Sequence, residues 1–488
     1  MRRHKKSGVP AKQDSISGHT TVEFAALIRK RLGDPPDLVV RHLIMGGSPA
    51  VLLFLDRLAD TKLLSETVLE TIVRDSASSP GVPPAAQIPI AAVRYRSSLD
   101  ESVEDLLGGK SLLFREGDDE CLVLDTFGPR TRNVEEPTAE TVVRGPRESF
   151  VENIGDNAAL VRLGLKNAAL RVRELHIGEH TKTTVYVLYV DGLAMPSVIE
   201  EVVRRLGGRQ IKRVAGHGTV ARQLQASPYP LFPTALVTER PDRVVAGLLE
   251  GRVAVLVDRT PFSVMVPSVF VEHLQSPEDY YENRMLQGII RIIRYTMLHL
   301  AILGPALYVA SVTFHHEMIP TPLLVTLLNQ REVVPFPAAL EALIMGFVFE
   351  GLREAGVRLP RPMGQAVSIV GGIVLGQAAI TAGIVSPAMV IVVGFTAIAS
   401  FTVPSLSLNA PQLILRVAFL LGAAVLGLYG VIVLYLFVLG HLLSIRSFGV
   451  PYFFPLVPIS KAGMMDTFVV SRPEVQDLNP IEQGGIDD

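Results

Sequence analysis

Tryptophan is absent from the 488-residue chain, and Cys121 is its single cysteine. One cysteine excludes an intrachain disulfide and the CxxC pairs of zinc or redox sites. The phosphate-binding GxxxxGKS/T loop, the HExxH zinc motif and the GxSxG nucleophile motif are also missing. A net charge of −2 provides no positive field for nucleic acid. We therefore expect no catalytic activity, no cofactor and no nucleic-acid partner.

The nearest approach to a metal-binding cluster is the group His176, Glu179 and His180. These residues lie in a polar stretch between apolar runs, and no further His or Cys completes a ligand set. A solvated loop is therefore favoured over a metal site.

Charge is scarce in the last third of the chain. Residues 1–287 hold 36 of the 46 Lys and Arg and 37 of the 48 Asp and Glu. Between Gly364 and Leu443 the only formally charged side chain is Arg416. A soluble surface needs charges, whereas a bilayer accepts apolar tracts of about 20 residues for each crossing. The sequence therefore predicts a soluble N-terminal α+β half followed by an α-helical polytopic membrane domain.

The N-terminal stretch 1–36 begins MRRHKKSG, which is basic but lacks the apolar core of a secretory signal peptide. We expect a disordered tail here, and a weak contact with anionic membrane lipid is the alternative.

An internal repeat occupies most of the soluble half. Two local matches carry it: FLDRLAD at 54–60 with YVDGLAM at 189–195, and LLGGKSLLF at 106–114 with LLEGRVAVL at 248–256. Their similar order and spacing indicate duplication. Each copy also contains a hairpin-like pair of strands, which argues against all-parallel sheets. We predict two related α/β subdomains with mixed sheets, at 37–145 and 146–275.

A hinge leads from the second subdomain into the membrane domain, 276–445. Arginine and tyrosine side chains gather there, as the bilayer interface favours. They are Tyr280, Tyr281, Arg284, Arg291 and Arg294. We expect this stretch to couple the two halves.

The membrane domain should contain four to five spans. In the first, Pro305 predicts a kink. The segment 336–352 is ambiguous, because it is short for a span and either crosses inside a bundle or lies at the surface. The last apolar run, 413–443, exceeds one span, so we expect it to be tilted or broken near 427–430.

Polar residues within these segments are candidates for an ion pathway or for contacts between helices. They are Glu341, Glu350, Arg353, Gln365, Gln377 and Asn409. Glu350 and Arg353 stand at i and i+3 and could pair. For the glutamates, a pathway and a place near the headgroups remain equally open. For the glutamines, contacts between helices are favoured.

Basic residues before the first span place the soluble half in the cytoplasm. The C-terminal tail, 446–488, also carries basic residues, but five full spans would put it outside. Either one segment is not a full span or the last run doubles back. We predict a cytoplasmic tail.

Six ordered blocks carry a family resemblance: VRGPRESFVENI (143–154), TERPDRVVAGLLEGRVAVLVD (238–258), QSPEDYYE (275–282), VPFPAALEALIMGFVFEGLREAG (334–356), LPRPMGQAVSIVGGIVLGQAAITAGIVSP (359–387) and RSFGVPYFFPLVP (446–458). Over about 37–465 the chain resembles the GerA spore germination receptor A-subunit family. One departure is Gly346, where family members often carry glutamate on the face shared with Glu350 and Arg353.

The resemblance implies an integral protein of the spore inner membrane that helps trigger germination in response to nutrients, and no enzymatic activity. It implies two partners, a transporter-like B subunit and a lipoprotein C subunit. Two roles remain open: a subunit of a homo-oligomeric ion-conducting path, or a non-conducting scaffold that signals. A stand-alone transporter is disfavoured, because no duplicated membrane half is seen.

Overall fold

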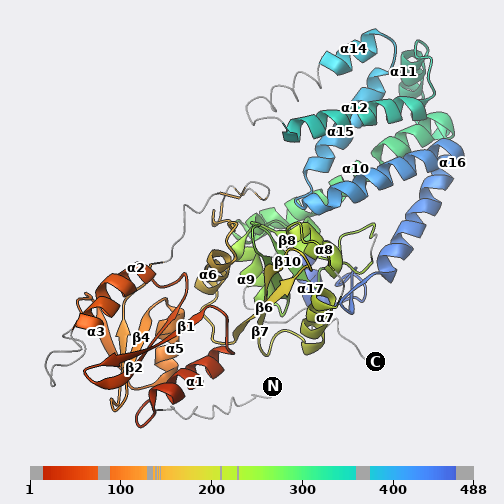
Figure 1. Ribbon diagram of the computed structural model, residues 1–488. Helices are drawn as coiled ribbons and strands as arrows, with labels where there is room; N and C mark the ends of the chain where they lie inside the picture. Colours follow the sequence, from red (N-terminus) through yellow and green to blue (C-terminus); the bar gives the residue numbers. More distant parts are fainter. Residues whose placement is uncertain are drawn as a thin grey trace. The chain divides into compact units, whose positions relative to one another are not determined.

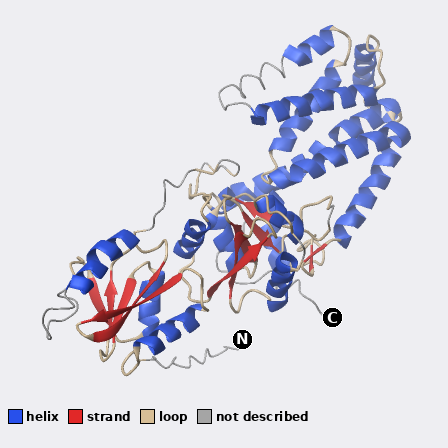
Figure 2. Ribbon diagram, viewed as in Figure 1, coloured by secondary structure: helices blue, strands red, loops and turns tan. Residues whose placement is uncertain are grey.

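A computed structural model describes residues 15–74, 88–128, 136–137, 140, 142, 144–208, 211–227, 230–358 and 374–468. The chain divides into two compact units. We call them the α/β unit (Met1–Val142, Pro146–Leu224 and Val237–Pro267) and the helical unit (Val143–Gly145, Gln225–Leu236 and Ser268–Asp488). Figure 2 shows that nearly all strands belong to two sheets, while helices dominate the rest of the chain. The predicted α+β N-terminal half and helical C-terminal half are confirmed.

The first sheet has the strand order β1-β2-β4-β5-β3, and each of its pairings is antiparallel. Its strands are β1 (Leu38–Met45), β2 (Ser48–Leu55), β3 (Val93–Arg96), β4 (Ser111–Arg115) and β5 (Cys121–Leu124). The accompanying helices are α1 (Thr21–Leu32), α2 (Thr61–Leu63), η1 (Leu64–Leu69), α3 (Glu70–Arg74) and α5 (Leu99–Leu107). Successive residues of a strand face opposite sides of the sheet. Leu53 therefore joins the core with Phe24, and Leu52 joins the core with Val68.

The second sheet repeats this order as β6-β7-β9-β10-β8. Its strands are β6 (Leu170–Ile177), β7 (Thr183–Val190), β8 (Leu236–Thr238), β9 (Val253–Val257) and β10 (Ser263–Val266). Its helices are α6 (Ile154–Gly164), α7 (Pro196–Gly207), α8 (His217–Leu224) and α9 (Pro241–Leu249) (Figure 1). Helices α7 and α9 each begin with proline, whose fixed φ suits the first helical position.

The two sheets are copies of one unit. Strands β2 and β7 have equal lengths and are 135 residues apart. Strands β4 and β9, and likewise the helices α5 and α9 before them, are 142 residues apart. The predicted duplication is therefore confirmed in strand order and in element bounds.

Helix α1 corrects one expectation. It lies within the stretch predicted to be disordered, and that prediction is wrong for Thr21–Leu32. Thr20 and Glu23 form a capping box at its start, and Gly33 ends it with a φ of 77°. Phe24 and Ile28 are fully buried, so the helix packs into the core of the first subdomain.

The helical unit is built around three long helices: α10 (Arg284–Thr313), α12 (Ala338–Arg358) and α16 (Asn409–Ser444). Its shorter elements are η3 (Phe270–Leu274), η4 (Pro277–Tyr280), η5 (His316–Met318), α11 (Thr321–Arg331), α14 (Gly376–Thr381), α15 (Pro387–Phe401), η7 (Leu406–Leu408), β11 (Arg446–Ser447), β12 (Val450–Pro451) and α17 (Lys461–Phe468). Among the described residues, two helical stretches, Arg284–Thr313 and Leu406–Ser444, are long and apolar enough to cross a membrane, and α15 is a shorter apolar helix.

Helix α16 folds back on itself at Gly427, which has φ 61° and ψ −142°. Its two arms, 409–426 and 428–444, bring Gly422 and Gly430 into contact. A straight helix would separate these two glycines by about 12 Å. A Cβ at position 427 would also lie 2.9 Å from the Phe314 Cβ, so this corner requires glycine. The predicted break near 427–430 is confirmed as a hairpin.

Candidate functional site in the helical unit

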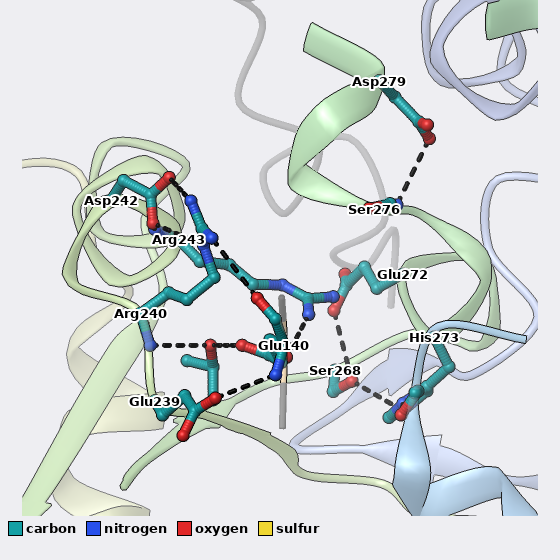
Figure 3. A network of polar contacts seen from close by, with 12 residues as sticks. Glu140, Glu239, Arg240, Asp242, Arg243, Ser268, Glu272, His273, Ser276 and Asp279 are labelled. Atoms are coloured by element: carbon teal, nitrogen blue, oxygen red, sulfur yellow. Dashed lines mark hydrogen bonds and ion pairs between the residues drawn. The ribbon is translucent and has the colours of Figure 1, made fainter. Parts of the chain in front are cut away.

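Asp279 is the centre of an ion-pair cluster at the start of α10. It is fully buried. Its Oδ2 accepts from the Ser276 N–H at 3.2 Å, which closes the capping box of η4 (Figure 3). The same carboxylate accepts from Arg291 Nε at 2.9 Å and from both terminal nitrogens of Arg294 at 2.8 Å. Residues 291 and 294 share one helical face, because they stand at i and i+3.

Asp466 of α17 completes this cluster. Its Oδ1 lies 3.4 Å from Arg291 Nη1, its Oδ2 accepts from the Tyr280 hydroxyl at 2.9 Å, and its backbone oxygen accepts from Gln275 Nε2 at 2.9 Å. Two carboxylates therefore face two guanidinium groups, and the buried charge is balanced. We call Gln275, Asp279, Tyr280, Arg291, Arg294 and Asp466 the entry cluster.

The chain beyond α16 also returns to the start of α10. The second arm of α16 runs back along α10, and Tyr435 lies near His299 with their rings 6.2 Å apart. The Phe270 N–H then donates to the Tyr452 oxygen at 2.8 Å, and the Ser268 N–H donates to Ser447 Oγ at 3.2 Å. The tail up to Phe468 is thus held at the same end of the helical unit as the segment that enters α10.

Two small polar groups accompany this return (Figure 3). Ser268 Oγ donates to Glu272 at 3.2 Å and lies 3.3 Å from His273 Nε2. The other ring nitrogen of His273 lies 3.0 Å from Ser405 Oγ. These contacts join η3 to the loop between α15 and α16.

Of the predicted coupling residues, the structure brings together Tyr280, Arg291 and Arg294. Tyr281 and Arg284 are exposed and lie outside the cluster. Neither carboxylate of the cluster was among the predicted coupling residues. Asp279 could have been suspected as the N3 acid of a capping box that begins at a serine. Asp466 carries no local signal, since it lies 175 residues from Arg291.

Pro305 and Arg416 form a second polar feature, within the helices. Proline has no N–H, so it leaves the carbonyl of Ala301, four residues earlier, without its helical partner. Arg416 Nε donates to that carbonyl at 3.0 Å. Arg416, the single charged residue of the apolar tract, therefore replaces the missing hydrogen-bond donor to the Ala301 carbonyl, and α10 continues through Pro305.

Glu350 and Arg353 form the predicted i,i+3 ion pair on α12. Both are close enough to interact electrostatically with Arg416. We call Glu350, Arg353 and Arg416 the mid-helix cluster. An isolated charged side chain is costly in hydrocarbon, and grouping these three lowers that cost because opposite charges lie near one another.

Glu341 lies apart from that cluster and is completely buried. Its Oε2 accepts from both the backbone N–H and the hydroxyl of Ser386 at 2.9 Å, and Oε1 lies 3.3 Å from Arg331 Nε. Ser386 in turn caps α15. Glu341 therefore joins α11, α12 and α15, which is a contact between helices.

Two further polar candidates, Gln377 and Asn409, are not gathered into either cluster. Gln377 is exposed on α14, and its backbone oxygen accepts from the Thr381 hydroxyl at 2.8 Å. Asn409 begins α16. Gln365 lies outside the described residues.

The α/β unit has a polar network of its own, which the sequence analysis also missed (Figure 3). Glu140 pairs with Arg243 at 2.8 Å, and the Glu140 N–H donates to Glu239 Oε1 at 2.8 Å. Arg240 is fully buried, pairs with Asp242 at 2.8 Å and donates to the Pro146 oxygen at 2.9 Å. This network ties the segment after the first subdomain to the start of α9.

Fold and site together define a class of two-unit proteins, in which a duplicated α/β module precedes a bundle of apolar helices with few, paired charges. The family model described as Bacillus/Clostridium GerA spore germination protein matches residues 26–480. The chain belongs to this GerA family, as its resemblance implied.

Two relatives agree with this assignment, and one solved structure resembles part of the chain. Spore germination protein KA of Bacillus subtilis (strain 168) is 41% identical over 446 residues, which cover 90% of this chain and 82% of that protein. Spore germination protein B1 of the same organism is 38% identical over 447 residues, which cover 91% and 92%. The crystal structure of the N-terminal domain of the A subunit of the Bacillus megaterium spore germinant receptor GerK3 is 25% identical in sequence. The matched region covers 50% of this chain and 94% of the GerK3 domain, with a TM-score of 0.39.

Proposed function

We propose that this chain is the A subunit of a nutrient germinant receptor in the spore inner membrane. Membership of the GerA family over residues 26–480 is the observation that carries the proposal. The relatives KA and B1 are spore germination proteins and match at least four-fifths of their own length. Under this proposal the chain works with a transporter-like B subunit and a lipoprotein C subunit. Co-purification of both from spore membranes through a tagged A subunit tests the assembly, and recovery of the A subunit alone would contradict it.

We further propose that the helical unit spans the membrane several times, with the α/β unit and the tail on the cytoplasmic side. Large apolar side chains are exposed on its helices, among them Phe347, Ile391 and Phe437 at 82%, 71% and 73%. Water disfavours so much exposed apolar surface, whereas lipid or a neighbouring subunit would cover it. The α16 hairpin supports an even number of crossings, because its second arm returns to the start of α10.

The mid-helix cluster supports a contribution to an ion-conducting path in a homo-oligomer. Charged side chains inside a membrane domain usually mark paths for ions or contacts between helices. In this cluster the carboxylate of Glu350 is the group that would attract a cation. Arg416 also has a structural role, because it donates a hydrogen bond to the Ala301 carbonyl.

Ion flux from liposomes tests this role. The purified chain should pass monovalent cations, and Glu350→Gln should change the flux at least several-fold without loss of assembly. The matched control is Glu317→Gln, which removes an exposed carboxylate from η5. No flux from the assembled, folded chain would instead favour the non-conducting scaffold.

A further inference from the structure

A cavity of about 420 Å³ lies inside the helical unit, between α10, both arms of α16 and the segment that follows them. This volume is within the range of small-molecule pockets. Its walls are mainly aromatic and aliphatic, and among the described residues that line it none is Asp, Glu, Lys or Arg. Burying an ion here would cost several kcal/mol, since none of these lining residues supplies a carboxylate, ammonium or guanidinium group to pair with it. The cavity therefore disfavours zwitterions such as free amino acids.

Two buried polar groups of the wall lack partners. Gln412 is 2% exposed, and neither its amide nitrogen nor its amide oxygen has a hydrogen-bond partner among the described residues. The hydroxyl of Tyr295 is likewise buried and without a partner there. An unsatisfied buried donor or acceptor costs about 1–3 kcal/mol. An amide presents a donor and an acceptor together, so an incoming group that does both would satisfy it.

We propose that this cavity binds an uncharged amphiphile with a hydroxyl or amide head group on a hydrocarbon chain. The head group hydrogen-bonds Gln412 and Tyr295, and the chain packs against the apolar wall. A free small amphiphile with a hydroxyl or amide supplies both the donor and the acceptor, whereas the ester region of a membrane lipid supplies the hydrocarbon chain and the acceptor alone. The site goes beyond the proposed receptor function and does not depend on it.

The cavity adjoins the entry cluster. Phe468 lines it and follows Asp466 by two residues in α17, and its ring lies 5.3 Å from that of Tyr295 at a tilt of 45°. A ligand in the cavity therefore contacts the same short helix that carries the carboxylate paired with Arg291. Occupancy should change how firmly α17 is held at the start of α10.

The absence of tryptophan allows a clean binding measurement on the full chain. Phe453 lines the cavity, and Phe453→Trp places the only tryptophan of the chain there, which can be excited at wavelengths that tyrosine does not absorb. In detergent, 10-bromodecan-1-ol should quench this fluorescence saturably, and decan-1-ol should reverse the quenching. L-Alanine should do neither. In nanodiscs, quenching by a chain-brominated phospholipid, reversed by decan-1-ol, would identify a lipid chain as the occupant.

Two leucine substitutions, each made in the reporter background, distinguish the site from general partitioning. Gln412→Leu should weaken bromodecanol binding by about three- to tenfold, the worth of a hydrogen bond. The matched control is Gln330→Leu on α11, which removes another glutamine whose Oε1 has no hydrogen-bond partner among the described residues but which lies outside the cavity. It should leave binding unchanged. Non-saturating quenching, or equal effects of the two variants, would overturn the proposal.

Discussion

The two units of this chain use charged residues in different ways. In the α/β unit many ion pairs lie at the surface, such as Glu201 with Arg204, whose side chains are 26% and 73% exposed. In the helical unit charges are few, and several are enclosed by protein, as Asp279 and Arg291 are at 0% and 1% exposure. A surface pair is worth little because water competes for both groups. A buried group is costly once its partner is removed, so breaking a buried pair of the helical unit should cost much more than breaking a surface pair of the α/β unit.

The largest expected effect is that of Asp279→Asn. It leaves Arg291 and Arg294 buried without their shared carboxylate, and breaking a buried pair costs about 3–5 kcal/mol. Thermal unfolding of the purified chain in detergent measures the loss. The control is Asp34→Asn in the α/β unit. The Asp34 side chain is 79% exposed and pairs with Arg29 at 3.5 Å, so this substitution should change the free energy of unfolding by less than about 0.5 kcal/mol. Similar effects of both variants would break the comparison.

A smaller effect is expected at Arg416, and it has a specific rescue. Arg416→Leu leaves the Ala301 carbonyl without a partner, which should cost about 1–3 kcal/mol. Adding Pro305→Ala restores the backbone N–H that can bond this carbonyl within α10. The double variant should therefore recover about 1 kcal/mol of the free energy of unfolding, measured as a coupling in a double-mutant cycle. Strict additivity would show that the two residues act independently.

Asp105 provides a test of buried against exposed ion pairs within the α/β unit alone, because its carboxylate is buried and pairs with Arg96 and Lys110. Burial raises its pKa, but hydrogen bonds from Lys110 at 2.6 Å and Arg96 at 2.8 Å outweigh burial and lower the pKa below its ordinary value. Asp105→Asn should reduce the free energy of unfolding by about 1–2 kcal/mol at neutral pH.

The sign of the pH dependence follows from the lowered pKa. The carboxylate contributes fully above its unfolded pKa of about 3.9, and this contribution is lost as the pH falls through the lower folded value. The difference between the wild type and Asp105→Asn, measured by urea unfolding, should thus shrink below about pH 4. Asp34→Asn, at a side chain that is 79% exposed, is the control and should change stability by less than about 0.5 kcal/mol. A constant difference down to the lowest pH would argue against the ion pairs as its source.

Local patterns in the sequence predicted the elements better than their partners. The repeated blocks predicted the duplication, and the glycines near 427 predicted the break in α16. The capping pattern of Thr20 and Glu23 was present and would have revealed α1. The partners of the charged residues could not be predicted, because Asp466 and Arg291 are 175 residues apart and Arg416 and Ala301 are 115 apart. Such pairs depend on tertiary packing, which one sequence does not reveal.

The placement of the C-terminal tail beside the start of α10 can be tested directly by cysteine labelling. On a Cys121→Ser background, Ser471→Cys probes the tail and Glu317→Cys probes the loop after α10. In sealed inside-out vesicles, a membrane-impermeant maleimide should modify position 471 and spare position 317, and right-side-out vesicles should show the reverse. Modification of both positions from the same side would contradict a helical unit that crosses the membrane and returns its tail to the cytoplasmic face.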